Sequence, residues 1–232
     1  MNLQNAAEGV AKLHKAAIIE LVAALCTVIA TIMGALAVVA VVDVGGQVAT
    51  QQAVNLVGVG ASSIGFVIFS LGAVVLAVIN LVLEISGTNL AKKDETETKF
   101  FASAFFCILA SLICTIVGTV LVTPIPALGN CLQSIGDIFN IFISWYVLKG
   151  VWGIANQIGD GELAAKAQSA ATVVAVVIAI SLIFKWVPKF FAAGIGQAIG
   201  IFLAIVAFVL SIVQIFMYLS VLKRAKESFS RQ

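Results

Sequence analysis

Six apolar stretches, each about as long as a lipid bilayer is thick, dominate this chain of 232 residues. Only 10% of the residues are charged, and 62% are hydrophobic. The hydrocarbon layer offers no hydrogen-bonding partners, so backbone groups that cross it must be satisfied within their own segment, as they are in an α-helix. The sequence therefore predicts an all-α membrane protein, a bundle of six transmembrane helices. We expect the spans near residues 16–42, 59–84, 99–122, 134–157, 167–186 and 195–222.

Six spans of about 20 residues, joined by short connections, leave no room between them for a folded soluble domain. In residues 1–15, apolar side chains recur at helical spacing opposite polar ones, which predicts an amphipathic segment in the headgroup region. A frayed polar tail is the alternative. The transmembrane domain is expected over residues 16–222, followed by a basic cytoplasmic tail at residues 223–232. The first apolar run is longer than a signal peptide needs, so we expect it to stay in the membrane.

The lysines and arginines indicate the orientation of the chain, because basic residues near span ends favour the cytoplasmic side. With both termini cytoplasmic, the only basic residues outside are Lys185 and Lys189. This predicts a multi-pass protein of the cell membrane. The odd-numbered spans begin just after Lys15, Lys99 and Lys166, which is consistent with three helical hairpins in parallel orientation. The positive-inside bias alone would also produce that pattern, so both interpretations stay open.

Two carboxylates at span ends form the first candidate site. Glu20 lies about one turn inside the first span, and Glu84 ends the second span on the same side of the membrane. Two carboxylates at similar depth are candidates for an ion or proton site, because charged groups inside a membrane are costly and usually functional. The alternative is that both are interface residues at helix ends, reaching the headgroups or a lysine.

The fourth predicted span carries the most polar face. Asp137, Asn140 and Ser144 share one side of the helix and form a candidate wall of an outward-facing vestibule. The alternative is that Asp137 is simply the N-cap of the fourth helix.

Small and polar residues recur at spacings of three, four or seven along most spans, which keeps each set on one stripe of a helix. Small residues let helix backbones approach closely in lipid, and amides bond across the seam, so we interpret the stripes as helix-packing surfaces. A polar path is the alternative. The candidate packing residues are Gly34, Gly118, Gly196, Gly200 and Gln214.

Several function classes find no support in the sequence. His14 is the only histidine, so a multi-histidine metal site is excluded, and no motif for a catalytic site or a cofactor is present. We expect no enzymatic activity, no metal and no cofactor. A net charge of +2 is too small to predict nucleic-acid binding.

The first function hypothesis is that this non-enzymatic protein acts by helix-mediated association in the lipid bilayer, with itself as a homo-oligomer or with another membrane protein. The alternative is a small channel or secondary transporter that uses the carboxylates at span ends. A weaker third hypothesis is that a lipid or hydrophobic small molecule binds between helices.

Overall fold

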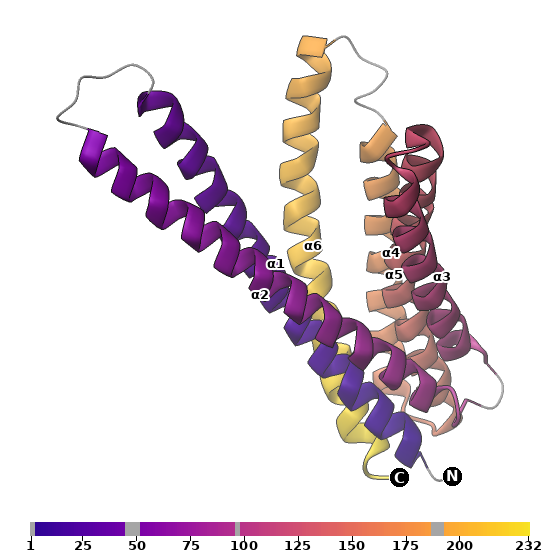
Figure 1. Cartoon of the computed structure of the whole chain (residues 1–232). Coiled ribbons are helices and arrows are strands. Elements are labelled where there is room, and N and C mark those ends of the chain that lie inside the picture. Colours follow the sequence, from indigo (N-terminus) through magenta and orange to yellow (C-terminus); the bar gives the residue numbers. More distant parts are fainter. Residues whose placement is uncertain (1–2, 45–51, 96–97, 187–192) are drawn as a thin grey trace. The chain divides into compact units, whose positions relative to one another are not determined.

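The computed structural model of the chain is all-helical over the residues it describes, which are 3–44, 52–95, 98–186 and 193–232 (Figure 1). Within these ranges, the structure does not describe the side chains of residues 34–44, 52–63, 178, 181–186, 193–209 and 211. The helices are α1 (Gln4–Val44), α2 (Gln52–Ala91), α3 (Phe100–Leu121), α4 (Pro126–Gln157), α5 (Gly161–Trp186) and α6 (Ala193–Phe229).

Membrane-length apolar helices account for most of the described chain. Four described stretches are long and apolar enough to cross a membrane, and each contains at least 22 residues. They are Gln4–Met33, Ile64–Ala91, Phe100–Leu121 and Pro126–Gln157. The prediction of an all-α chain with membrane-length helices is confirmed at this level. The number of spans, the hairpin arrangement and the sidedness of the termini stay predictions.

The helices extend beyond the predicted spans. α1 begins at Gln4, so residues 4–15 form the first turns of a continuous helix of 41 residues. α2 continues to Ala91. α4 begins at Pro126, where proline occupies the first turn and lacks an N–H that would have no partner there. Hydropathy indicates only the apolar part of each helix. The helical residues beyond the predicted spans are stabilised by packing against other helices.

The chain divides into two compact units. Unit 1 comprises Met1–His14 and Leu83–Gln232, and unit 2 comprises Lys15–Val82. Both α1 and α2 therefore pass from one unit into the other.

The core of unit 1 is concentrated at one end of the helices. α1, α3 and α5 begin there, and α2, α4 and α6 end there. Large apolar side chains there are at most 1% exposed. They include residues 3–13 of the amphipathic sequence, whose apolar face is covered by protein. Full burial of such a side chain outside the hydrocarbon stabilises the fold by about 1.5–3 kcal/mol. The residues are Leu3, Val10, Leu13, Phe101, Leu148, Ile154, Leu163, Leu222 and Phe229.

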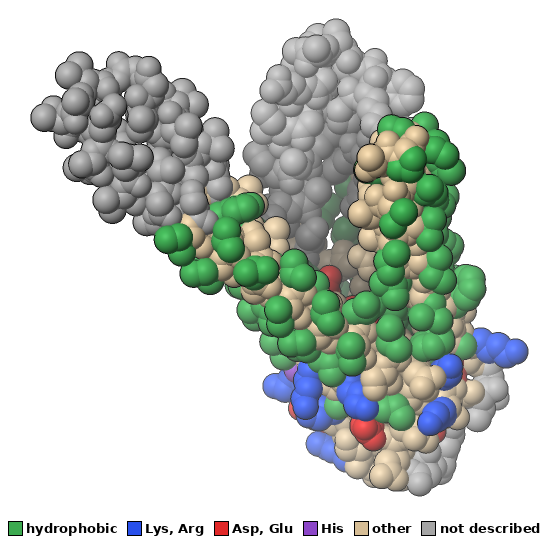
Figure 2. Space-filling model, viewed as in Figure 1, with side chains coloured by type: hydrophobic (Ala, Val, Ile, Leu, Met, Phe, Trp, Pro, Cys, Tyr) green, Lys and Arg blue, Asp and Glu red, His purple; other side chains and the backbone are tan. Residues whose placement is uncertain are grey.

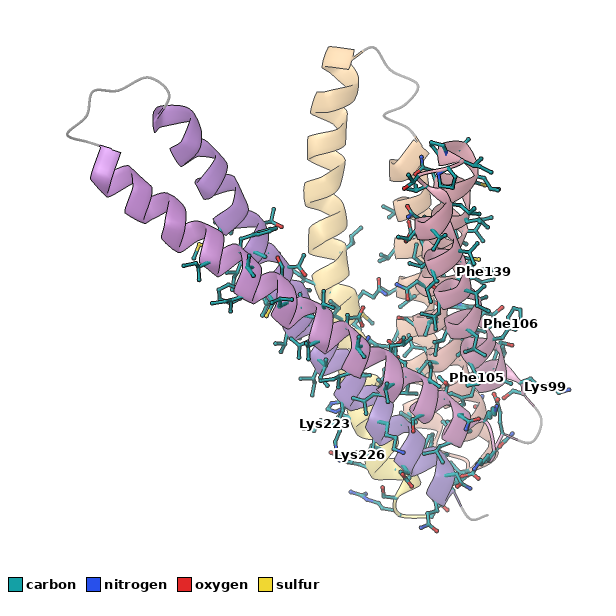
Figure 3. The ribbon with its side chains drawn as sticks, in the orientation of Figure 1. Lys99, Phe105, Phe106, Phe139, Lys223 and Lys226 are labelled. Carbon is teal, nitrogen blue, oxygen red and sulfur yellow. The ribbon has the colours of Figure 1, made fainter. Side chains whose placement is uncertain are left out.

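α3 and α4 pack closely along their length. A Cβ atom placed on Gly118 of α3 would lie 2.9 Å from the Gly129 carbonyl oxygen and from the Gln133 backbone nitrogen of α4. Two turns away, the Ser111 hydroxyl donates a hydrogen bond to the Gly136 carbonyl at 2.9 Å. Phe106 and Phe139 meet edge to face with ring centroids 6.4 Å apart (Figure 3). The two helices thus form one rigid pair.

Unit 2 consists of segments of α1 and α2. The Met33 side chain lies 3.3 Å from the position that a Cβ atom on Gly65 would take. Most large apolar side chains of the unit face outward instead. On α2 they are 43–62% exposed from Ile64 to Val82.

Candidate functional site at the charged end of unit 1

Most polar contacts described for unit 1 lie in one region, which we call the charged end and define as residues 3–14, 83–104, 145–170 and 216–232. Figure 2 shows lysine, arginine, aspartate and glutamate side chains together there, whereas hydrophobic side chains cover α3 and α4 beyond it. Salt bridges and hydrogen bonds in this region join segments that lie far apart in the sequence.

Asp94 binds the beginning of α1. Its carboxylate accepts hydrogen bonds from the Ala6 backbone N–H at 2.7 Å and from the Asn5 side-chain amide at 2.8 Å. The first amides of a helix have no partner within the helix and carry the positive end of its dipole. Asp94 therefore caps α1 from the connection that follows α2.

Glu95 does the same for α3. Its carboxylate accepts the backbone N–H of Phe100 at 2.6 Å and that of Phe101 at 3.0 Å, with the Thr98 hydroxyl at 3.1 Å. Lys99, at the N-cap position of α3, makes no side-chain capping bond, so the cap comes from four residues earlier. Burial raises the pKa of the Glu95 carboxyl, although the bonds from the amides of α3 act in the opposite direction.

Asp160 caps α5 and also binds α6. One carboxylate oxygen accepts the Leu163 backbone N–H at 3.0 Å, and the other accepts the Ser228 hydroxyl at 2.6 Å. The Ser228 bond, followed by the Leu163 bond, holds the pKa of Asp160 below its ordinary value. α1, α3 and α5 are thus each capped by an acidic side chain at the same end of unit 1.

A pair of glycines brings α1 and α2 into backbone contact at the charged end. A Cβ atom on Gly9 would lie 2.5 Å from the Gly87 carbonyl oxygen, and one on Gly87 would lie 2.8 Å from the Gly9 carbonyl oxygen. Beside this contact, the Lys12 ammonium donates to the Ser86 hydroxyl at 3.1 Å and pairs with Glu8 at 3.0 Å. Only glycine permits such an approach.

α5 and α6 are joined by charges. The Glu162 carboxylate pairs with Lys166 at 3.1 Å and with Arg224 of α6. The hydrogen bond from Lys166, and then the charge of Arg224, hold the pKa of Glu162 below its ordinary value. Exposed pairs of this kind contribute little to stability, so their main consequence is the local charge.

Lys149 is held between aromatic rings on α4. Its ammonium lies 5.0 Å from the Trp152 ring centroid and 5.9 Å from that of Trp145, and it donates to the Gln168 side chain of α5 at 2.7 Å. Cation–π contacts and the amide replace part of the hydration of this lysine. Lys149 therefore serves as a link between α4 and α5.

The candidate carboxylates belong to different units, Glu20 to unit 2 and Glu84 to unit 1. Glu20 is exposed on α1, and Glu84 is half-buried on α2, where its backbone carbonyl accepts the Thr88 hydroxyl at 2.7 Å. A shared ion or proton site therefore stays a prediction.

On α4, Asp137 and Asn140 are exposed and Ser144 is half-buried. The alternative interpretation of Asp137 as an N-cap is wrong, because α4 already begins at Pro126 and Asp137 lies well inside the helix. The outward polar face stays a prediction.

The structure describes the surroundings of only some of the candidate packing residues. Gly118 lies against α4 of the same chain, so its close contact is intramolecular. Gln214 is half-buried on α6. Gly34, Gly196 and Gly200 fall outside the residues whose surroundings the structure describes.

Sequence reasoning missed the capping role of the acidic clusters and the contact of Gly9 with Gly87. A signal was present for Asp160, because an aspartate directly before a helix is a preferred N-cap. No local signal marks Asp94, since the backbone N–H that it caps, that of Ala6, lies 88 residues before it in the sequence.

Comparison with known proteins finds no matching family model, no similar curated protein and no similar solved structure. Within the described ranges, no three histidine, cysteine, aspartate or glutamate side chains form a group able to hold a metal ion.

Proposed function

We propose that the chain is a multi-pass protein of the cell membrane that crosses the bilayer six times and acts without enzymatic activity. It works by associating with itself or with another membrane component. The charged end lies on the cytoplasmic side together with both termini.

The distribution of charges along the sequence supports three hairpins. Between Glu20 and Glu84 the only charged residue is Asp43, and between Lys99 and Lys149 it is Asp137. Lys185 and Lys189 are the only charged residues between Lys166 and Lys223. Charged residues are therefore sparse in each pair of helices away from the charged end, and the basic excess at the charged end favours the cytoplasm.

The exposed surface of unit 2 is the observation that carries the proposal of association. Many large side chains in the described part of α2 face outward and form an apolar surface along that helix. Gly72 lies in this region, and no described atom lies within 4 Å of the position of a Cβ atom. A helix face with a small residue and no neighbour among the described residues is available to a second helix. The outward side chains are Ile64, Phe66, Val67, Ile68, Leu71, Val74, Val75, Val78, Ile79 and Val82.

Hydroxyl groups on the stripes of small and polar residues are hydrogen-bonded within their own helices, so they do not require a polar path through the membrane. On α1, Thr27 donates to the Ala23 carbonyl at 2.9 Å and Thr31 to the Thr27 carbonyl at 2.8 Å. Thr119 on α3 bonds to the Thr115 carbonyl in the same way at 2.8 Å. Such bonds satisfy the hydroxyl donor within its own helix. This favours packing surfaces over the lining of a channel.

The proposal is tested by the mass of the detergent-purified protein, measured by multi-angle light scattering with bound protein identified by mass spectrometry. We expect a multiple of 24.2 kDa or a stoichiometric membrane partner. Gly72→Leu should remove the association, because it places a bulky side chain on the open face of α2. Gly118→Leu is the matched control, since its contact is with α4 and it should lower stability without a specific effect on association. A monomeric wild-type chain without a partner would refute the proposal.

The alternative function, a channel or transporter, has one supporting observation. Glu20 is exposed on α1, in a segment whose other exposed side chains are apolar, such as Ile18 and Val22, which are both 43% exposed. If Glu20 carries an ion or proton, Glu20→Gln should abolish flux into liposomes while the protein still folds. Equal flux for the two proteins would exclude this role.

A further inference from the structure

A groove lies between α5 and α6, where the charged end meets the apolar part of unit 1. Its volume is about 500 Å³, within the range of sites for small molecules. Side chains from both helices line it, and those at its rim are exposed to the surroundings. The lining includes Glu162, Lys166 and Ser169 of α5 and Phe216, Met217 and Ser220 of α6.

The polarity of the groove changes along the helix axes. α5 and α6 run in opposite directions (Figure 1), and the contact of Glu162 with Arg224 fixes the charged end of the groove. Two turns from Arg224 along α6, Phe216 is 65% exposed and forms the apolar end with Met217. Phe216 and Arg224 share one helix stripe, because they are eight residues apart. The groove thus joins a charged part to an apolar part in the direction in which a lipid lies in a bilayer.

The charged part offers cationic and hydroxyl donors. Two cations, Lys166 and Arg224, pair with the exposed carboxylate of Glu162, and their charges also act on Asp160. The hydroxyls of Ser169 and Ser220 are exposed and have no hydrogen-bond partner among the described residues. Lysine, arginine and hydroxyl donors are the groups that bind phosphate oxygens.

We propose that this groove binds one anionic phospholipid of the surrounding bilayer. The headgroup phosphate lies at Lys166 with a hydroxyl donor from Ser220, and an acyl chain lies along Phe216 and Met217. An apolar helix of another protein suits the groove less well, because it would cover the Lys166–Glu162 pair and remove both charges from water. A lipid leaves the charged rim hydrated while it covers the apolar end.

The test measures lipid binding to the full chain, purified in non-ionic detergent and freed of lipid, by native mass spectrometry. Phosphatidylglycerol and phosphatidylcholine with identical acyl chains are the probes, and inorganic phosphate is the competitor. We expect phosphatidylglycerol to bind more tightly than phosphatidylcholine. Lys166→Gln should weaken phosphatidylglycerol binding about fivefold, the effect of one basic residue near an anionic surface.

Lys223→Gln is the matched control, because Lys223 is exposed on α6 and does not line the groove (Figure 3). It should leave phosphatidylglycerol binding unchanged. Ser220→Leu fills the groove without a change of charge and should weaken the binding of both lipids. If Lys166→Gln does not fold, Ser220→Leu decides the question by itself.

Three results would overturn the proposal. Equal weakening by Lys166→Gln and Lys223→Gln would show that lipids respond only to the general basic surface. Unchanged binding by Ser220→Leu would place the lipid elsewhere. Complete competition by inorganic phosphate at the concentration of the lipid would show a phosphate site that makes no use of the acyl chain.

Discussion

The backbone contact between Gly9 and α2 makes Gly9→Ala a sensitive probe of the charged end. The new Cβ atom would lie 2.5 Å from the Gly87 carbonyl oxygen and 2.7 Å from the Ala91 backbone nitrogen. Ordinary contacts of this kind begin at 3.4 Å, so the first distance must grow by about 0.9 Å (3.4 minus 2.5). Neither neighbouring atom belongs to a flexible side chain, and the two helices must therefore move apart.

The expected cost follows from three contributions. Overpacking of a close contact costs about 1–3 kcal/mol. Separation of α1 from α2 also weakens the hydrogen bonds of Asp94 to the beginning of α1, which is worth about 1 kcal/mol. Alanine stabilises a helix by about 1 kcal/mol relative to glycine. The net expectation for Gly9→Ala is a loss of about 2 kcal/mol in the free energy of unfolding.

Gly72→Ala is the matched control, because the chemical change is the same and nothing lies within 4 Å of the new Cβ atom. It should gain up to about 1 kcal/mol from helix propensity alone. The free energies of unfolding are compared by equilibrium unfolding in mixed micelles of rising SDS content, followed by far-UV circular dichroism. Equal stability of the two variants would refute the proposed contact between α1 and α2.

Three further predictions concern unit 1. Asp94→Ala should remove the cap of α1 at a cost of about 1–2 kcal/mol, seen as faster amide hydrogen exchange in residues 6–9 without a comparable change in α4. For Asp160, the depressed pKa means that its stabilising effect is present above the ordinary value of 3.8 and is lost as pH falls through the lower folded value. The difference in melting temperature between wild type and Asp160→Asn should therefore be constant from pH 5 to 7 and shrink below about pH 4, and a constant difference at all pH values would contradict this role. Gly118→Leu should lower the melting temperature through its clash with Gly129 and Gln133, and an unchanged melting temperature would contradict the close packing of α3 and α4.

The helical class and the approximate positions of the helices follow from hydropathy, whereas the helix ends do not. The second span is expected to end near residue 84, but α2 continues to Ala91 because Gly87 and Ala91 pack against Gly9. Hydropathy reports which residues suit hydrocarbon, and it carries no information on a polar helix end held by another part of the chain. The start of α4 at Pro126 was accessible from the rule that proline favours the first turn of a helix.

The candidate site was less predictable than the fold. The acidic residues at 94, 95 and 160 stand out in the sequence, but what each one binds depends on which helix ends meet in space. The lipid groove has the same origin, since Lys166 and Phe216 are separated by 50 positions and come together only through the pairing of α5 with α6. Spacing along one helix cannot reveal contacts between helices.

The position of Asp94 in the sequence determines when the cap of α1 can form during synthesis. Asp94 is synthesised 88 residues after Ala6, so the nascent chain carries an uncapped first helix until the connection after the second helix has left the ribosome. Ser228 likewise reaches Asp160 only after 68 further residues have been added. The N-terminal turns are thus secured once the first two helices have emerged, whereas the bond between α6 and Asp160 forms only after α6 has been made.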